Sequence, residues 1–237
     1  MMRDVKAILW METKNLSRDK EFPVWIRYLL LPIILTALLS IVNKDPRSTS
    51  FLIHVLAMLV AIFSSIILTP VVFLREKDGN IYRTLFTSRM EKKAIIWGKF
   101  LFVNILSIGI SILFTFICRM MLALFFDQEI MQQVLNTAQW ILVLIGWICA
   151  ALTVGAGIIL SLRVESSQQA IQKLISYFLI PPALVAVMLY VFHPKLSSVN
   201  FLLNNVQIIL IIACILLSTT AIVMRVAYKR FLAQTFE

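Results

Sequence analysis

The chain has 237 residues, of which 60% are hydrophobic and only 14% are charged, and its mean hydropathy is +0.91. These values exclude a water-soluble globular protein. The net charge of +10 does not indicate a nucleic-acid-binding protein, because the basic residues lie between apolar runs rather than on one amphipathic surface.

Residues 1–20, which precede the first apolar run, have the pattern of an amphipathic helix. Their apolar residues approximate helical spacing, with charged residues elsewhere: Val5, Ile8, Leu9 and Leu16, with Trp10 and Met11 beside them. Such a helix is typical of the boundary between a membrane and water. We therefore expect an interfacial helix at the start of the chain.

Six apolar runs follow, at 22–42, 51–74, 94–126, 138–162, 174–192 and 206–224. A membrane-spanning helix needs about 20 residues, so each run is close to or above the required length. The sequence predicts an all-α integral membrane protein, with one transmembrane domain over 1–237 and six spans. Pro181 and Pro182 interrupt the fifth span, and Arg119 near the far end of the third is interpreted as an arginine that reaches the interface rather than as a substrate contact.

The distribution of basic residues predicts the orientation. The N-terminal segment, the gaps after the second and fourth spans and the C-terminal tail hold 17 Lys and Arg residues, and the alternate gaps hold 3. Basic loops stay in the cytoplasm, so both termini are predicted to be cytoplasmic. The protein itself is predicted to lie in the plasma membrane of a bacterial cell. The gap after the second span contributes seven of the 17: Arg75, Lys77, Arg83, Arg89, Lys92, Lys93 and Lys99.

The segment 75–93 is too long and too patterned for a tight turn. Ile81, Leu85, Phe86 and Met90 can share one helical face, and basic residues remain available to solvent or to a partner. This pattern predicts a short cytoplasmic helix with an apolar docking face.

The sequence lacks the motifs of several site classes. No phosphate-binding loop of the form G-x-x-x-x-G-K-[ST] is present, His54 and His193 have no second metal ligand at suitable spacing, and the three cysteines lie inside apolar runs. Spans two, four, five and six carry no Asp, Glu, Lys or Arg, which argues against an ion-coupled carrier. Span four is rich in small residues, which indicates close helix packing, either inside the subunit or between subunits.

The residues around the cytoplasmic segment resemble the signature of type-2 ABC transporter permeases. The similar residues are Arg75-Glu76-Lys77-Asp78-Gly79-Asn80-Ile81, then Leu85 and Thr87, then Ile95-Ile96-Trp97-Gly98-Lys99. Six spans with cytoplasmic ends, the N-terminal helix and the tail Tyr228-Lys229-Arg230-Phe231 extend the likeness over the whole chain. Two positions depart from the family pattern: Asn80 replaces a usual threonine, and Ser88 stands where proline is common.

The resemblance implies a permease that is not itself an enzyme and binds no cofactor. Two permease copies, identical or homologous, would pair with two ATPase subunits that bind ATP and Mg. The ATPase coupling residues would then be Glu76, Asp78, Gly79, Ile81, Leu85, Phe86 and Met90. The implied function is export of an amphipathic peptide, as in immunity to antimicrobial peptides, or of a hydrophobic drug or a lipid-like substrate.

An export path is expected at a two-fold dimer interface, lined by apolar and hydroxyl side chains. The candidate residues are Thr36, Ser40, Ser64, Ser65 and Thr69. The alternative function is a membrane protein that works without ATP, as a secondary carrier or as a membrane-embedded assembly or immunity factor.

Overall fold

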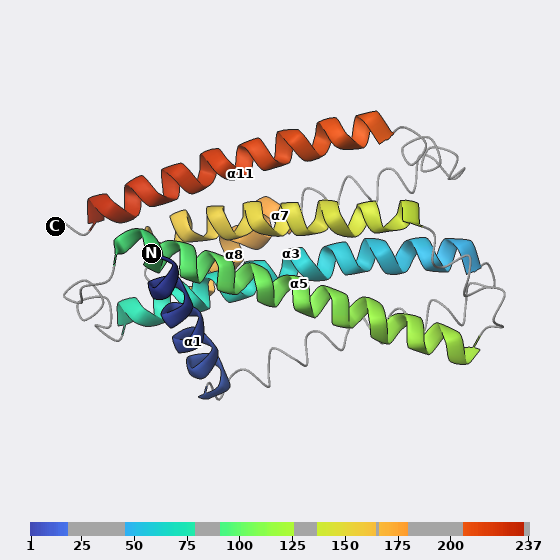
Figure 1. The fold of residues 1–237 in the computed structure, drawn as a ribbon, viewed down its shortest axis with the longest axis horizontal. Helices are drawn as coiled ribbons and strands as arrows, with labels where there is room; N and C mark the ends of the chain where they lie inside the picture. Colours follow the sequence, from blue (N-terminus) through green and yellow to red (C-terminus); the bar gives the residue numbers. More distant parts are fainter. Residues whose placement is uncertain (19–45, 79–90, 126–136, 165, 180–205, 235–237) are drawn as a thin grey trace.

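A computed structural model of the chain describes residues 1–18, 46–78, 91–125, 137–164, 166–179 and 206–234. All the regular structure in these ranges is helical: α1 (Met2–Arg18), α3 (Pro46–Asp78), α5 (Lys92–Phe125), α7 (Thr137–Ser161), α8 (Ser167–Leu174), a short π-helix η1 (Ile175–Leu179) and α11 (Val206–Gln234). The four long helices α3, α5, α7 and α11 form a bundle, and α1 lies across α5 near one end of it (Figure 1). The helical fold class is therefore confirmed for the described residues.

The start of α1, the end of α3, the start of α5 and the end of α11 lie at the same end of the bundle, which we call the inner end (Figure 1). The end of α5 and the start of α7 lie at the opposite, outer end. This arrangement agrees with the predicted placement of both termini on one side of a membrane. Which side that is follows from the basic residues and stays a prediction.

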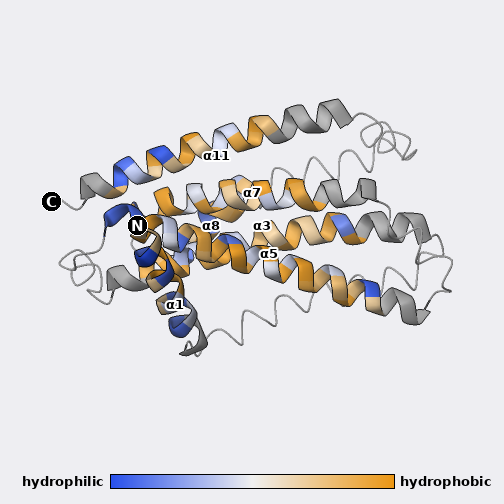
Figure 2. Ribbon diagram, in the orientation of Figure 1, coloured by the Kyte–Doolittle hydropathy of each residue, from blue (hydrophilic) through white to orange (hydrophobic). Residues whose placement is uncertain are grey.

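Three of the described helices are long and apolar enough to cross a membrane: Ile53–Leu74 in α3, Lys92–Met120 in α5 and Val143–Ser161 in α7. Figure 2 shows apolar residues along most of their length and hydrophilic residues concentrated on α1 and toward the inner end. The predicted span 22–42 and most of the predicted span 174–192 lie outside the described residues, so the number six stays a prediction.

The long helices extend beyond the apolar runs that predicted them. The helix predicted over 51–74 covers Pro46–Asp78, and the one predicted over 206–224 continues to Gln234. Apolar runs mark the part of a helix that lies in hydrocarbon, whereas backbone hydrogen bonding continues into the polar region. Pro46 suits the first helical position of α3, because the first amide of a helix has no partner within it.

The inner half of the bundle has the largest apolar core. This cluster of buried side chains joins α1, α3, α5, α7 and α11 and includes Ile8, Phe73, Ile95, Ile96, Phe100, Val154, Ile158, Ala227 and Phe231. A smaller cluster, built from Ile53, Ala57, Val60, Phe114, Cys118 and Val143, connects α3, α5 and α7 farther toward the outer end. The inner end is therefore the place where α1 is integrated with the long helices.

Small residues on α7 allow close packing inside the subunit. A Cβ added at Gly146 would lie 2.8 Å from the Cα of Met58 on α3, and one at Gly157 would lie 2.7 Å from Thr69 Cγ2. On another side of α7, a Cβ at Gly155 would meet Val223 of α11 at 3.0 Å. For these three glycines the structure confirms internal packing, which is the usual use of small residues between membrane helices.

Gly146→Ala is expected to destabilise the protein by about 1–3 kcal/mol, because the added methyl group meets the backbone of α3 and the two helices must separate. Gly109→Ala is the matched control, since a Cβ at Gly109 meets nothing within 4 Å. Thermal unfolding of both variants in detergent checks the difference. Equal transition temperatures for the two variants would contradict the packing argument.

Candidate functional site

The inner ends of α3 and α5 flank the segment predicted to be the docking helix. Glu76 and Asp78 belong to the last turn of α3, and Lys92 is the first residue of α5. Gly79, Ile81, Leu85, Phe86 and Met90 lie outside the described residues, so their coupling role stays a prediction. The structure therefore describes the end of α3 and the start of α5, the two helix ends that flank 79–90.

Lys99, in the second turn of α5, links the two helix ends. Its Nζ donates a hydrogen bond to the backbone oxygen of Val72 on α3 over 2.9 Å and lies 5.3 Å from the centroid of the Phe73 ring. The side chain is fully buried. A buried ammonium group needs such partners, because removing a charge from water is costly unless polar groups replace the water.

Glu12 of α1 provides the opposite charge. Its Oε1 lies 2.9 Å from Lys99 Nζ, and both side chains are almost completely buried. Lys99 therefore links three helices. It belongs to α5, forms an ion pair with Glu12 of α1 and donates a hydrogen bond to the backbone of α3. Breaking a buried ion pair by removing one partner leaves an uncompensated charge, so the three helices are held in one specific arrangement.

Gly98 lets α1 approach α5 closely. A Cβ at this position would lie 2.8 Å from Ile8 Cγ2, and Ile8 itself is 1% exposed. Ile8 and Glu12 are four residues apart and so lie on the same face of α1. Gly98 and Lys99 thus both contact this face of α1. The glycine provides space for Ile8, and the lysine forms the ion pair with Glu12.

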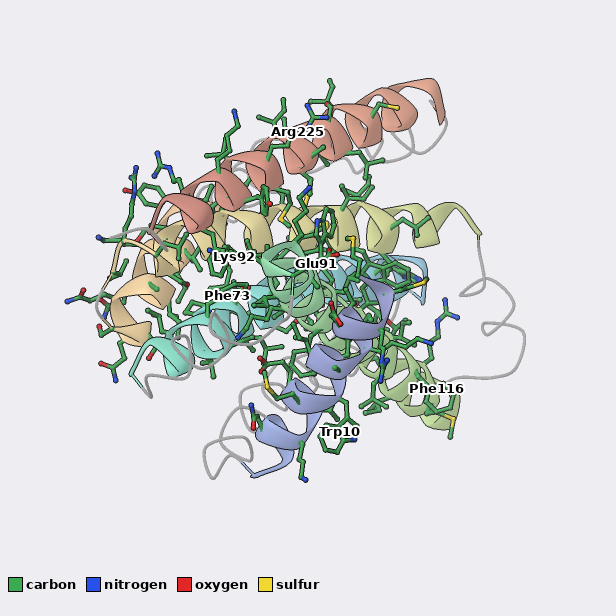
Figure 3. All side chains as sticks on the ribbon, turned by 60° about the vertical axis from the view of Figure 1, so that its left-hand side comes forward. Trp10, Phe73, Glu91, Lys92, Phe116 and Arg225 are labelled. Atoms are coloured by element: carbon green, nitrogen blue, oxygen red, sulfur yellow. The ribbon has the colours of Figure 1, made fainter. Side chains whose placement is uncertain are left out.

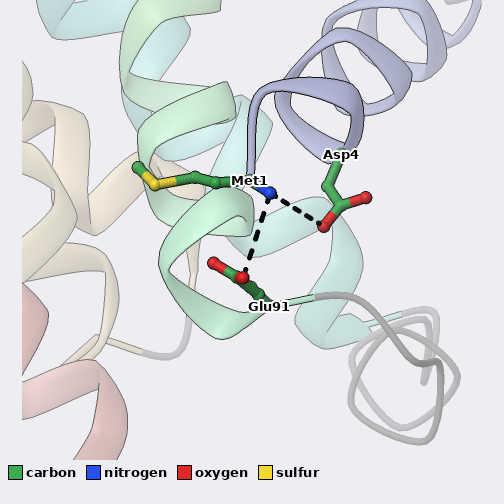
Figure 4. A network of polar contacts seen from close by, with 3 residues as sticks. All are labelled: Met1, Asp4 and Glu91. Carbon is green, nitrogen blue, oxygen red and sulfur yellow. Dashed lines mark ion pairs between the residues drawn. The ribbon is translucent and has the colours of Figure 1, made fainter.

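A second polar contact between α1 and α5 lies at the surface. The Met1 amino group is 3.8 Å from Asp4 Oδ2 and 3.9 Å from Glu91 Oε1, where Glu91 immediately precedes α5 (Figure 4). The Met1 and Glu91 side chains are more than half exposed. Exposed ion pairs contribute little to stability, so the buried pair is the stronger link between α1 and α5.

The sequence-based interpretation of Lys99 was wrong. It counted Lys99 with the basic residues of a cytoplasmic loop, whereas the structure places it inside α5 with no solvent exposure. The signal for a buried site was present in the sequence: a Gly-Lys pair inside an apolar run, together with an acidic residue on the apolar face of the N-terminal helix. Neither signal alone identifies the partner.

Three of the predicted path residues lie in the described part of α3. Ser64, Ser65 and Thr69 are all buried; Ser65 Oγ hydrogen-bonds Thr153 Oγ1 of α7, and Thr69 packs against Gly157. The Thr69 hydroxyl also donates to the backbone oxygen of Ser65. In this structure Ser65 and Thr69 fill the contact between α3 and α7, so a path along them, which stays a prediction, requires these helices to separate. Thr36 and Ser40 lie outside the described residues.

Another polar contact between helices lies toward the outer end. Arg119 Nη2 of α5 is 3.2 Å from Nε2 of His54 on α3, and His54 is fully buried. A guanidinium group can only donate, so His54 Nε2 accepts and the proton of the neutral ring is on Nδ1. This contact gives Arg119 a protein partner that the sequence-based interpretation did not identify.

The described residues contain no group of three or more His, Cys, Asp or Glu side chains that could hold a metal ion. Cys118, Cys149 and Cys214 are free thiols. The predicted absence of a metal or catalytic site elsewhere in the chain stays a prediction.

Comparison with known families assigns the chain by sequence. The family model described as ABC-2 type transporter matches residues 3–190, a region that begins in α1 and includes α3, α5, α7 and α8. No curated protein matches the chain with significance. The match covers well over half of the 237 residues.

Proposed function

Because the chain belongs to the ABC-2 type transporter family and is a permease subunit of an ABC transporter, we propose that it exports its substrate with energy from ATP hydrolysis in separate ATPase subunits. Two copies of the permease, identical or homologous, would pair with two ATPases that bind the ATP and Mg. The inner end of the bundle would face the cytoplasm, where the ATPases dock, in the plasma membrane of a bacterial cell.

The observation that carries this proposal is the junction formed by Glu12, Lys99 and the Val72 carbonyl group. It joins α1 to the two helices that flank 79–90, with 2.9 Å contacts in a solvent-free environment. A displacement of the 79–90 segment by an ATPase would act on the ends of α3 and α5, and the junction makes these ends move together with α1. This rigidity supports a coupling role for the inner end.

The charge pattern of the spans supports an apolar or amphipathic substrate. The apolar stretches Ile53–Leu74, Lys92–Met120 and Val143–Ser161 contain no Asp or Glu. Their buried lysine, Lys99, is paired with Glu12 of α1, and Arg119 contacts His54. Ion-coupled carriers and transporters of charged substrates usually place acidic groups within their spans. We therefore propose that the cargo is an amphipathic peptide, a hydrophobic drug or a lipid-like molecule, taken from the cytoplasm or the inner leaflet.

The proposal predicts that an ABC ATPase is retained when the tagged chain is purified from native membranes in mild detergent. The reconstituted complex should hydrolyse ATP. When amphipathic peptides, hydrophobic drugs and lipids are each added, the class that is transported should raise the rate of ATP hydrolysis. A variant of the ATPase that cannot hydrolyse ATP is the control for both hydrolysis and transport. Transport by the purified chain in vesicles without an ATPase or ATP would contradict the proposal.

A further inference from the structure

α1 has a second face, opposite the one that packs on α5. Three basic residues and a tryptophan, Arg3, Lys6, Trp10 and Lys14, are all exposed. Their spacing of three, four and four residues places them on one side of the helix. We call these four residues the basic-aromatic stripe.

Trp10 occupies the middle of the stripe and is 66% exposed, a high value for the largest side chain. Figure 3 shows it pointing away from the other helices. Lys14 Nζ lies 4.8 Å from the centroid of the Trp10 ring, so the cation and the ring face the surroundings together. The stripe thus combines an amphipathic ring with positive charge.

The acidic residues of α1 do not belong to this stripe. Glu12 is buried in the ion pair with Lys99, and Asp4 is paired with the Met1 amino group. Among the side chains of α1 that the structure describes, the stripe therefore carries positive charge alone. Ile8 packs on Gly98 and Glu12 forms an ion pair with Lys99. A rotation of α1 that points the stripe in another direction would therefore break the buried ion pair.

The direction of the stripe follows from the packing of α1. The helix lies across the side of α5, at the level of its second turn, rather than over the end of the bundle (Figure 1). A face opposite α5 therefore points sideways, along the plane of a membrane that contains the bundle. Three cations at this level would be costly in hydrocarbon, whereas they are favourable among lipid headgroups.

We propose that the basic-aromatic stripe binds the phosphate groups of anionic phospholipids in the leaflet at the inner end. Lys and Arg attract anionic headgroups close to a membrane surface, and tryptophan prefers the boundary between hydrocarbon and water. An ATPase is the other candidate partner for a basic surface. It would approach the inner end along the bundle axis, toward the ends of α3 and α5 that flank 79–90, whereas the stripe points sideways.

Lipid binding can be measured on the permease alone, so the test does not depend on export. The full-length protein is reconstituted in phosphatidylcholine vesicles that contain trace spin-labelled phosphatidylglycerol or spin-labelled phosphatidylcholine. Electron spin resonance then gives the fraction of each lipid immobilised by the protein. We expect a preference for phosphatidylglycerol of about threefold or more at low salt, which decreases as salt screens the charges.

The variant R3Q/K6Q/K14Q should reduce this preference to near unity. Its matched control is R225Q/K229Q/R230Q, which removes the same charge from exposed positions of α11 at the same end. The control should keep most of the preference. We expect α1 to remain docked in both variants, because the substituted side chains are exposed and the contacts of Glu12 with Lys99 are untouched. Thermal unfolding of both variants checks this.

Three results would overturn the inference. A wild-type lipid preference in R3Q/K6Q/K14Q would show that the stripe does not select the lipid, and the same variant losing a co-purifying ATPase would assign the surface to that protein. An equal loss of preference in both triple variants would show that total charge, not the stripe, attracts the lipid.

Discussion

Lys99→Met is expected to lower the free energy of unfolding by about 3–5 kcal/mol, the usual cost of removing one partner of a buried ion pair. The methionine fills a similar volume but leaves Glu12 with its charge in an environment from which water is excluded. It also removes the donor to the Val72 backbone oxygen. Both losses act on the contact of α1 with the inner ends of α3 and α5.

Thermal unfolding in detergent measures this effect, together with Glu12→Gln and the double variant E12Q/K99M. The double variant should be less destabilised than the sum of the two single variants, because neither an isolated carboxylate nor an isolated ammonium group remains. Lys229→Met, at an exposed position of α11, is the control for the substitution itself. Additive single effects, or a Lys99→Met protein as stable as the control, would show that the pair is not coupled.

Leu85→Asp or Phe86→Asp should strongly reduce retention of the ATPase and uncouple ATP hydrolysis from transport. The argument rests on the sequence, since Ile81, Leu85, Phe86 and Met90 can share one helical face and a contiguous apolar patch in water usually marks a binding surface. Burial of about 200 Å² of apolar surface corresponds to roughly 5 kcal/mol before the costs of association. A carboxylate in the centre of such a contact removes most of this gain.

Co-purification of the ATPase and transport per ATP hydrolysed are the measurements for these variants. Thr87→Asp is the matched control, because it introduces the same charge in the same segment at a hydroxyl position rather than an apolar one. Membrane insertion is checked for each variant. A normally inserted Leu85→Asp or Phe86→Asp protein that retains the ATPase and transports at the wild-type level would exclude these residues as the docking contact.

The sequence predicted the long helices closely because hydrocarbon imposes a strong constraint, whereas α8 (Ser167–Leu174) lies almost wholly in the stretch interpreted as the gap between the fourth and fifth spans. A chain that crosses hydrocarbon must satisfy every backbone polar group internally, so a long apolar run indicates a helix. The runs 94–126 and 138–162 correspond to α5 at Lys92–Phe125 and α7 at Thr137–Ser161. The glycines of α7 also indicated close packing, although the sequence could not decide whether their partners belong to the same subunit.

The polar contacts between helices could not be predicted in the same way. Periodicity shows which face of a helix is apolar, but not which residue on a distant helix meets it. Lys99 was therefore grouped with solvated lysines, and the contact of Ser65 with Thr153 of α7 was not identified. Trp10 was placed beside an apolar face, and only the packing of Ile8 and Glu12 shows that it points outward.

The ion pair between Glu12 and Lys99 also has a consequence for the biosynthesis of the protein. A ribosome completes α1 long before it reaches α5, so the newly made helix has neither the lysine for Glu12 nor the glycine for Ile8. α1 can dock only after α3 and the first turns of α5 have entered the membrane. Docking of α1 therefore reports that two later helices are inserted in the correct orientation, and a chain with an inverted α5 would lack both the partner of Glu12 and the space for Ile8.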